Sequence, residues 1–357
     1  MKALVARSAA LDVVVEDVEL PPVAPGEVRV EVAAAGVCHS DLSMVDGTLA
    51  PDFPLVLGHE AAGVVVEAGA DVDRARVGDH VVLNWAPPCR HCWFCVHGEP
   101  WLCAYGLRPS VQRGRLADGT ALHVTLGLGA LAEEVVVPAA AVLPIPAELP
   151  LDAAALLGCA VLTGFGAVRH TAGVRLGESV AVIGLGGVGL SVLAAARSAG
   201  ADPVIAVDVS EAKRELALAA GATEFVVSAD TLSKQVRALT GGRGADHAFE
   251  CVGRAATIRS AWSVTRRGGG CTIVGIGRRD DRVEFSAGEL FHLARTLRSS
   301  VYGSSDPDKE LPALARDVLE GRFDPGMLVT HRVPLDAAPA ALGRIQRGEG
   351  ARTLVTF

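Results

Sequence analysis

Hydrophobic residues in the first half of the chain occur as short runs of valine and alanine, and proline or glycine residues separate these runs. Such runs, joined by irregular sequence, are typical of short strands connected by loops. They predict strands at residues 28–35, 61–68, 81–83 and 134–137. We therefore expect an N-terminal region made mostly of β-structure.

From about residue 161 the pattern changes to an alternation of strands and helices. This alternation is the sequence signature of a doubly wound parallel sheet in an α/β fold. After about Val301 the alternation stops, and the chain ends in a strand-like segment at residues 352–357. The predicted elements of the α/β region are strands at 179–183, 204–207, 224–227, 247–251 and 271–276, a helix that ends at Ala199 and a helix that begins at Glu211.

Composition and charge narrow the class of protein. Half of the 357 residues are hydrophobic but only 4% are aromatic, which suits parallel sheets covered by helices. The net charge of −8 argues against a nucleic-acid partner, whose phosphates would repel the protein. No apolar run approaches the roughly 20 residues that a membrane-spanning helix needs. We expect a cytoplasmic protein without a membrane partner.

Four cysteines lie in one short segment, with two, two and seven residues between them: Cys89, Cys92, Cys95 and Cys103. This spacing lets a short loop fold four sulfurs around one tetrahedral zinc ion. The alternatives are a disulfide or a redox-active pair, but cytosolic chains rarely keep disulfides. The loop therefore predicts a closed, structural zinc site.

A glycine-rich turn lies between an apolar strand and an alanine-rich helix. Glycine at these positions permits a tight turn and lets a pyrophosphate approach the amides at the helix N-terminus. Asp208 follows about 20 residues later, where a carboxylate accepts the ribose hydroxyls of NAD and would repel the 2′-phosphate of NADP. The turn therefore predicts NAD as cofactor. Its residues are Gly184, Gly186, Gly187, Val188 and Gly189.

These motifs, with others in the same order, resemble the zinc-dependent medium-chain alcohol dehydrogenases over the whole chain. The other motifs are GVCHSD at residues 36–41, GHE at 58–60, FECVG at 249–253 and RTLVTF at 352–357. The resemblance implies a GroES-like catalytic domain of residues 1–160, to which residues 302–357 return. It also implies a Rossmann NAD-binding domain at residues 161–301, with the active site between the two domains.

The resemblance implies that Cys38, His59 and Cys159 bind a catalytic zinc ion and leave its fourth position open. Taken alone, His59 could be a hydrogen-bonded strand histidine and Cys159 a small buried hydrophobe. Glu60 would lie close behind the metal, and Asp41 would hold the other ring nitrogen of His59. The expected cofactors are thus NAD and two zinc ions per chain.

In this family the zinc ion and the nicotinamide together carry out hydride transfer between an alcohol and NAD. Ser40 would take the hydroxyl proton into a relay. Many family members end that relay on a histidine five residues after the first cysteine ligand, but this chain has Ser43 there. The proton must therefore leave through water, His39 or another route.

Further site residues follow from the resemblance alone. His39 and Arg352 would contact the pyrophosphate, Lys213 the adenosine ribose, and Thr163 the nicotinamide. The remaining cofactor contacts would be Cys251, Val252, Val274, Ile276 and Tyr302. A mostly apolar substrate pocket would accept a primary aromatic, allylic or medium aliphatic alcohol, and it would be lined by Ser40, Leu49, Trp85, Thr125, Leu126 and Ile276.

Other functions stay open at this point. A thiol-dependent formaldehyde dehydrogenase of the same family would need basic groups at the pocket mouth, for which Arg108, Arg113 and Arg115 are candidates. A non-catalytic dinucleotide-binding zinc protein would lack a catalytic ligand, and a nucleic-acid-binding zinc module fits the acidic charge poorly. The segment from Arg115 to Val137 resembles an insertion of dimeric members. We therefore expect a homodimer joined through a strand near Val301.

Overall fold

Two units make up the chain in the computed structural model, which describes residues 1–106 and 108–357. The first unit contains Met1–Leu162 and Asp306–Phe357, and the second contains Thr163–Ser305. The predicted boundaries, after residues 160 and 301, lie two and four residues before these divisions.

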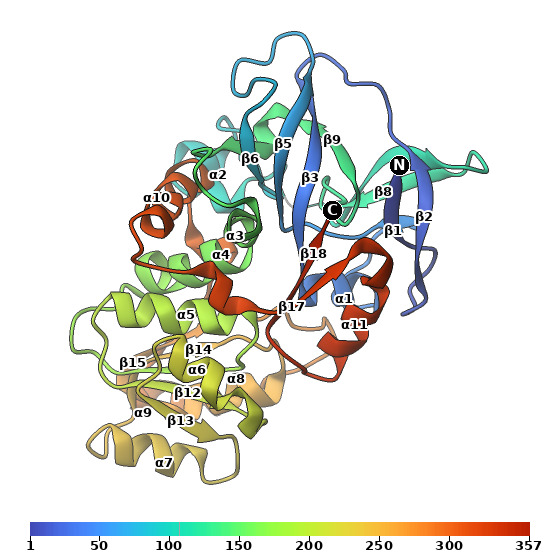
Figure 1. Ribbon diagram of the computed structural model, residues 1–357. Helices are drawn as coiled ribbons and strands as arrows, with labels where there is room; N and C mark the ends of the chain where they lie inside the picture. Colours follow the sequence, from blue (N-terminus) through green and yellow to red (C-terminus); the bar gives the residue numbers. More distant parts are fainter. Residues whose placement is uncertain (107) are drawn as a thin grey trace. The chain divides into compact units, whose positions relative to one another are not determined.

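The first unit contains a closed barrel and a mixed sheet (Figure 1). The barrel order is β1 (Lys2–Ala6), β2 (Val13–Glu19), β7 (Ser110–Leu116), β8 (Ala121–Thr125) and β4 (Leu55–Val56). The sheet order is β10 (Val142–Pro144), β6 (His80–Leu83), β5 (Ala61–Ala68), β3 (Glu27–Val37), β18 (Arg352–Thr356) and β17 (Val329–Pro334), and β9 (Glu134–Pro138) also pairs with β3. The main helices are α1 (His39–Val45), α2 (Trp93–Val96), α3 (Leu151–Ala155), α10 (Pro307–Leu319) and α11 (Pro339–Gln346).

Strand β3 lies inside this sheet, and the first residues of the strand alternate between the core and the opposite face. Val28 and Val30 are fully buried in the hydrophobic core. Arg29, between them, donates hydrogen bonds to Glu67 of β5 at 3.1 Å and Glu134 of β9 at 3.0 Å. Apolar packing on one face and ion pairs on the other set the register of the neighbouring strands.

The C-terminal strand β18 returns to the centre of the first unit (Figure 1). It pairs antiparallel with β3, with Thr353 opposite Val37 and Leu354 opposite Gly36. This pairing brings Arg352 beside the residue that follows β3, Cys38. The end of the chain thereby contributes to a site formed by residues near its beginning.

The second unit is a parallel sheet of six strands with the order β13, β12, β11, β14, β15 and β16. The four residues of its central strand β11 are all buried. The strands are β11 (Val180–Ile183), β12 (Val204–Asp208), β13 (Glu224–Val227), β14 (Ala245–Glu250), β15 (Thr265–Ile273) and β16 (Thr296–Ser299). The helices are α5 (Gly187–Ser198), α6 (Arg214–Ala219), α7 (Leu232–Leu239), α8 (Ala255–Val264) and α9 (Ala287–Leu293), and α4 (Ala160–Gly166) contains the division between the units.

Two predicted strands are displaced in the structure. Strand β15 begins at Thr265 and ends at Ile273, so Val274 and Ile276 follow the strand instead of belonging to it. The sequence pattern did not predict the first part of β15, because three consecutive glycines lie at residues 268–270 and glycine disfavours strands. The outer strand β16 ends at Ser299 and does not include Val301.

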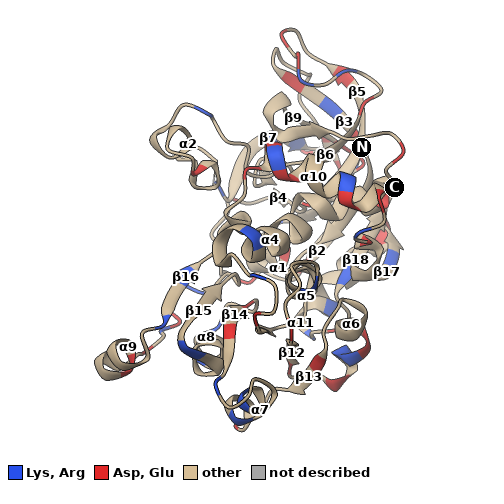
Figure 2. Cartoon of the chain, turned by 90° about the vertical axis from the view of Figure 1, so that its left-hand side faces the viewer, with Lys and Arg blue, Asp and Glu red and all other residues tan. Residues whose placement is uncertain are grey.

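No single helix in the described ranges is long and apolar enough to cross a bilayer, although the bent pair Leu151–Gly158 and Ala160–Ala172 meets that criterion by length and composition. In the view of Figure 2, basic and acidic residues are interspersed along the elements instead of forming separate faces.

Candidate active site

The three predicted catalytic-zinc ligands come together in the first unit. Cys38 precedes helix α1, His59 lies between β4 and β5, and Cys159 follows a short 3-10 helix, Leu156–Gly158. Their ligand atoms all lie within 4.8 Å of one another, and the three residues are buried. Two thiols and one imidazole are the donor set of one type of catalytic zinc site.

Asp41 organises this group from a fully buried position. Its Oδ2 accepts the Cys38 N–H at 2.8 Å, and its Oδ1 accepts the Gly58 N–H at 3.0 Å. Oδ1 also lies 3.1 Å from Nδ1 of His59. A carboxylate only accepts hydrogen bonds, so Nδ1 of His59 carries a proton, and in the neutral ring Nε2 carries a lone pair.

Nε2 of His59 tests whether this site fits a metal. The atom is buried, and no residue in the described part of the chain provides it with a hydrogen-bond partner. A buried imidazole nitrogen without a partner is costly unless a ligand occupies it. The orphaned nitrogen, beside two thiols, fits a bound zinc ion.

Glu60 and Arg352 lie next to the ligands and are also buried. Nη2 of Arg352 is 3.2 Å from Sγ of Cys38 and 3.2 Å from Oε2 of Glu60. Burial raises the pKa of Glu60 to about 7, although the positive charge of Arg352 opposes this shift. A hydrogen bond from Cys159, together with Arg352, lowers the pKa of Cys38 well below its ordinary value.

The contact between Arg352 and Cys38 is a feature that sequence reasoning missed. The sequence analysis assigns Arg352 to the cofactor pyrophosphate, whereas here its guanidinium group lies against a metal ligand and Glu60. The contact depends on the pairing of β18 with β3, which joins segments more than 300 residues apart. No local sequence signal carries that information.

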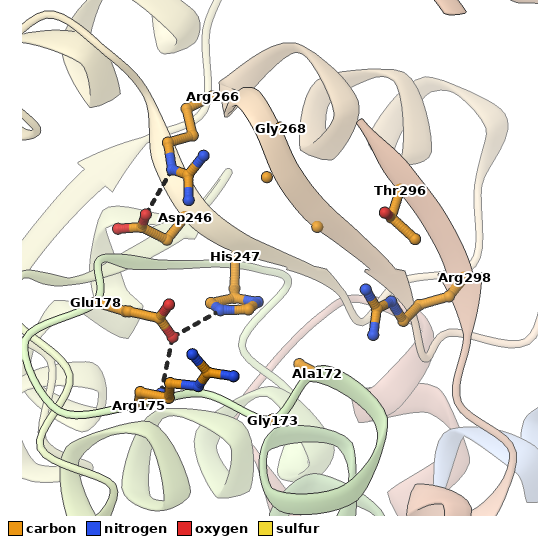
Figure 3. Close-up of a pocket in the computed structure, with 12 residues that line it drawn as sticks. Ala172, Gly173, Arg175, Glu178, Asp246, His247, Arg266, Gly268, Thr296 and Arg298 are labelled. Atoms are coloured by element: carbon orange, nitrogen blue, oxygen red, sulfur yellow. Dashed lines mark hydrogen bonds and ion pairs between the residues drawn. The ribbon is translucent and has the colours of Figure 1, made fainter. Parts of the chain in front are cut away.

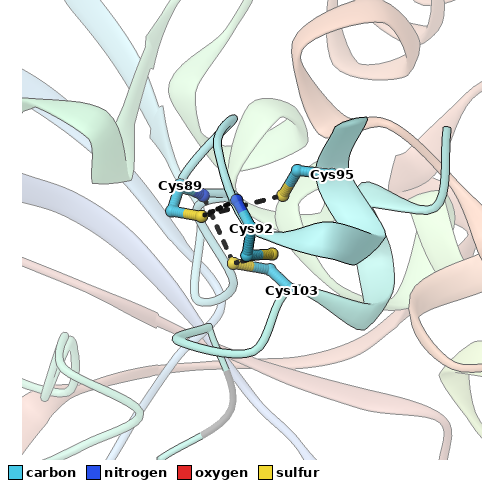
Figure 4. Close-up of side chains that lie close together, drawn as sticks. All are labelled: Cys89, Cys92, Cys95 and Cys103. Atoms are coloured by element: carbon cyan, nitrogen blue, oxygen red, sulfur yellow. Dashed lines mark hydrogen bonds between the residues drawn. The ribbon is translucent and has the colours of Figure 1, made fainter. Parts of the chain in front are cut away.

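The four clustered cysteines form a second group in the first unit (Figure 4). The Sγ atoms of Cys89 and Cys95, and those of Cys92 and Cys103, are each 3.9 Å apart. A disulfide needs about 2.05 Å, whereas sulfurs bound to one zinc ion at about 2.3 Å lie about 3.8 Å apart. A backbone hydrogen bond from Ala104 lowers the pKa of Cys92 to about 6, which favours the thiolate that a metal requires.

Ion pairs join this four-cysteine loop to the start of helix α10. Arg90 donates hydrogen bonds to the two carboxylate oxygens of Asp306 at 2.6 and 3.0 Å, and it also pairs with Asp308. Arg74 pairs with Asp308 from a different loop. The sequence analysis did not identify these arginines, because their partners are more than 200 residues away.

The other predicted residues of the first unit have mixed surroundings. The Oγ atom of Ser40 lies 3.8 Å from Sγ of Cys38, and His39 is exposed at the start of α1. Thr125 is fully buried, and its hydroxyl donates to the Val56 carbonyl at 2.9 Å. The remaining predicted pocket residues are partly buried against the main hydrophobic core, and they are Leu49, Trp85 and Leu126.

In the second unit the glycines of the GLGGVG turn have three separate roles. Gly184 has a φ of +90°, which favours glycine. A Cβ at Gly189 would lie 1.9 Å from the Gly184 carbonyl oxygen, so glycine permits close packing of helix and strand. A Cβ at Gly186 would meet no atom within 4 Å. The turn therefore leaves open space beside the N-terminus of α5, where a pyrophosphate would bind.

Asp208 ends β12 beside this turn. Its Oδ2 accepts the Leu185 N–H at 2.9 Å, and its Oδ1 accepts the Ser210 N–H at 3.0 Å. These bonds orient the carboxylate and leave further acceptor capacity for ribose hydroxyls. Nζ of Lys213 lies 3.5 Å from the Leu185 carbonyl oxygen, and burial lowers the pKa of Lys213 despite the nearby charge of Asp208.

Glu250 is another residue that the sequence analysis did not assign to the site. It is fully buried at the end of β14, and one of its oxygens accepts hydrogen bonds from Val252 N at 2.9 Å, Gly253 N at 2.8 Å and Thr257 Oγ1 at 2.7 Å. Glu250 thus holds the turn that carries the predicted cofactor contacts Cys251 and Val252.

The remaining predicted contacts of the second unit lie in loops, within helix α4 and at the start of a short 3-10 helix, Tyr302–Ser304. Gly253 packs against the backbone of Ile276, and Ile276 is 50% exposed. Val274 donates its N–H to the Glu250 carbonyl at 2.7 Å. Thr163 and Tyr302 are buried.

The second unit has the doubly wound sheet of dinucleotide-binding domains, and the first unit has two groups of residues suited to binding zinc. Together these features define the class of zinc-dependent dehydrogenases. Comparison with known proteins agrees with this class. Residues 24–147 match the alcohol dehydrogenase GroES-like domain, and residues 187–319 match the zinc-binding dehydrogenase domain.

The relatives extend over the whole chain. The NDMA-dependent alcohol dehydrogenase of Amycolatopsis methanolica is 34% identical over 99% of this chain and 98% of its own length. The S-(hydroxymethyl)glutathione dehydrogenase of Photobacterium damsela subsp. piscicida is 33% identical over 100% and 99%. The structure of benzyl alcohol dehydrogenase from Acinetobacter calcoaceticus superimposes with a TM-score of 0.91 at 27% identity, covering 100% of this chain and 99% of that one.

The chain therefore belongs to the zinc-dependent medium-chain alcohol dehydrogenase family and is an oxidoreductase. The predicted family, the GroES-like and Rossmann fold class and the enzyme class are confirmed. The grouped cysteines and histidine agree with the two predicted zinc sites.

Proposed function

We propose that the protein is an NAD-dependent alcohol dehydrogenase that reversibly oxidises a primary alcohol to the aldehyde. The observation that carries the proposal is the convergence of Cys38, His59 and Cys159, with the buried Nε2 of His59 lacking a partner among the described residues. When bound there, zinc supplies a Lewis acid for the alcohol oxygen, and NAD supplies the hydride acceptor.

The residues of the chain position these groups. Asp41 would keep His59 in the tautomer that presents Nε2 to the metal, and Arg352 would balance the negative charge of Cys38 and Glu60. Ser40 would take the hydroxyl proton, because its Oγ is 3.8 Å from a metal ligand. Asp208 supports NAD over NADP, because its carboxylate would repel a 2′-phosphate.

The partly buried Leu49, Trp85 and Leu126 support an apolar alcohol such as a benzylic, allylic or medium aliphatic one. An apolar pocket separates homologous substrates by about 1–3 kcal/mol per methylene group. Rates should therefore change gradually across a series of alcohols, without a sharp cut-off.

The test follows NADH absorbance with a panel of benzylic, allylic and aliphatic alcohols, before and after a chelator removes the metal. NADP and NDMA serve as alternative acceptors, the latter because one relative is named for its dependence on it. Metal analysis should give two zinc ions per chain. Cys38→Ser should abolish turnover and leave NAD binding largely intact. Cys271→Ser is the control, because Cys271 lies outside both clusters. Full activity of Cys38→Ser would refute the ligand assignment.

A second candidate is oxidation of the S-hydroxymethyl adduct of a thiol, because several relatives are named S-(hydroxymethyl)glutathione dehydrogenase. This substrate would need basic residues at the pocket. However, Arg113 pairs with Glu27 at 2.8 Å, and Arg115 donates to the Gly119 carbonyl at 3.1 Å. The third predicted arginine, Arg108, is exposed and makes no such contact among the described residues. Rates with formaldehyde in the presence and absence of glutathione separate the two functions.

We also propose a cytoplasmic homodimer. In the part of the chain that the structure describes, all eight cysteines are free, which suits a reducing compartment. Strand β16 is the outer strand of its sheet, and Leu297 on it is 39% exposed. An open edge of this kind can pair with a second copy. Light scattering of the purified protein measures the oligomeric state directly.

A further inference from the structure

A polar pocket lies in the second unit, at the end of the sheet opposite the GLGGVG turn. Because the strands are parallel, their C-terminal ends carry the turn and Asp208. The pocket instead involves His247 near the start of β14 and Thr296 at the start of β16. It also includes Arg175, in the loop before β11. The two features therefore lie at different ends of the strands.

The pocket has a volume of about 210 Å³, which is smaller than the 300–1,000 Å³ typical of drug-sized ligands. Glycines and charged side chains make up most of its lining. Three guanidinium groups face two carboxylates, which leaves a net positive charge, and Figure 2 shows basic residues on β15 and β16. The charged lining residues are Arg175, Glu178, Asp246, Arg266 and Arg298, and His247 also lines the pocket.

The two carboxylates are already engaged by other groups. Asp246 accepts hydrogen bonds from Ser179 N at 2.8 Å and Ser179 Oγ at 2.6 Å, and from Arg266 Nε at 2.5 Å. Glu178 accepts the backbone N–H of Arg175 at 2.8 Å and lies 3.0 Å from Nε2 of His247. These contacts reduce the repulsion that the carboxylates would exert on an anion.

Two cations in the pocket lack a counter-charge. Within the described ranges, no carboxylate pairs with Arg175 or Arg298. Arg298 donates from Nη1 to the Thr171 carbonyl at 2.7 Å, but its buried Nε has no hydrogen-bond partner in the described chain. Nδ1 of His247 is likewise buried without a partner among these residues.

These groups face a common space (Figure 3). The His247 ring lies between Glu178 and the guanidinium group of Arg298, and the guanidinium group of Arg175 lies beside the ring. Gly270 keeps the space open, because a Cβ there would lie 3.5 Å from Nδ1 of His247 and 3.7 Å from Nη2 of Arg298.

We propose that this pocket binds a small oxyanion of the phosphate class. Guanidinium groups bind such oxygens through paired, charge-assisted hydrogen bonds. The ion would join Arg175 in the loop before β11 to Arg298 on β16. Because the ion binds only the folded unit, it stabilises that unit against unfolding.

The test measures inorganic phosphate binding to the zinc-loaded protein by calorimetry. Saturating NAD occupies the dinucleotide turn, and chloride at equal ionic strength corrects for screening. Wild type should bind phosphate saturably and should unfold at a higher temperature in its presence. Arg175→Gln should weaken binding by about tenfold or more, the loss expected for one charge-assisted contact. Arg175 is exposed, so this variant should fold normally.

Gly270→Ala provides a second variant that keeps every charge. Its methyl group would make ordinary contacts of 3.5 and 3.7 Å, so the fold should tolerate it while the oxyanion space becomes smaller. Arg243→Gln, an exposed arginine outside the pocket lining, is the matched control and should bind phosphate like wild type.

Glycerol phosphate and glycerol form a further arm. Similar affinity for glycerol phosphate and inorganic phosphate would show that the phosphoryl group is recognised, and tighter inorganic phosphate would identify the free ion; both support the site. The proposal is overturned if wild type shows no saturable binding beyond the chloride effect, or if Arg175→Gln and Gly270→Ala both bind phosphate as wild type does.

Discussion

Replacing Asp41 with asparagine tests how the first unit builds its metal site. Asp41 is fully buried and serves three partners: Cys38 N and Gly58 N, both as hydrogen-bond donors, and Nδ1 of His59. Asparagine has nearly the same volume and keeps one oxygen, which can still accept from Gly58 and His59. Its NH₂ group then faces the Cys38 N–H, and two donors cannot bond to each other.

The expected loss follows from this mismatch. A buried N–H without an acceptor costs about 1–3 kcal/mol, and changing charged acceptors to a neutral one costs about 1 kcal/mol more. The free energy of unfolding should therefore fall by about 2–4 kcal/mol. Zinc affinity should fall by about 10–100-fold, because a metal-bound histidine depends on the group that holds its other nitrogen.

Two measurements separate these effects. Urea unfolding followed by circular dichroism gives the stability, and transfer of zinc to a chromophoric chelator gives the relative affinity. Asp46→Asn is the matched control, because Asp46 is exposed just after the same helix and accepts one backbone hydrogen bond, from Thr48 at 2.9 Å. The control should change stability by less than about 0.5 kcal/mol. Equal unfolding and equal zinc transfer for the two variants would refute the role of Asp41.

Three further predictions address other parts of the molecule. Gly186→Val should fold like wild type, since its Cβ meets no atom within 4 Å, but it should raise the KM for NAD. Gly189→Ala should lower the melting temperature, because its Cβ would lie 1.9 Å from Gly184 O. Steady-state kinetics and thermal unfolding distinguish the two variants, and equal behaviour would contradict the assigned roles. Cys103→Ser should leave one zinc ion per chain and lower the melting temperature, and metal analysis that still finds two would exclude the four-cysteine site. Burial opposes the shift, but hydrogen bonds from Ser179 and the charge of Arg266 lower the pKa of Asp246 from 3.8 to about 2. A carboxyl group with a lowered pKa stabilises the folded protein at pH values above the pKa of the unfolded chain. The free energy of unfolding of wild type should therefore exceed that of Asp246→Asn by about 1–2 kcal/mol at pH 7, after allowing for solvent screening. The advantage should shrink as pH falls from about 4 towards 2, and urea unfolding at pH 7 and pH 3 would show an unchanged gap if the reasoning is wrong.

Local chemistry made several features readable from the sequence. The four-cysteine loop needs only short spacings, and the glycine turn needs only a strand, a turn and a helix in succession. Valine alternation in strand β3 likewise marks its buried face. In each case the determining interactions lie within a few residues of one another, so the pattern records them directly.

Tertiary structure decided the features that join distant segments. Arg352 contacts Cys38 only because β18 pairs with β3, and Asp41 accepts the Gly58 N–H across a chain reversal. The phosphate-class pocket depends on three strands and a loop that no short motif connects. Backbone pairing and burial bring these partners together only as the tertiary structure forms, so short local patterns do not record them.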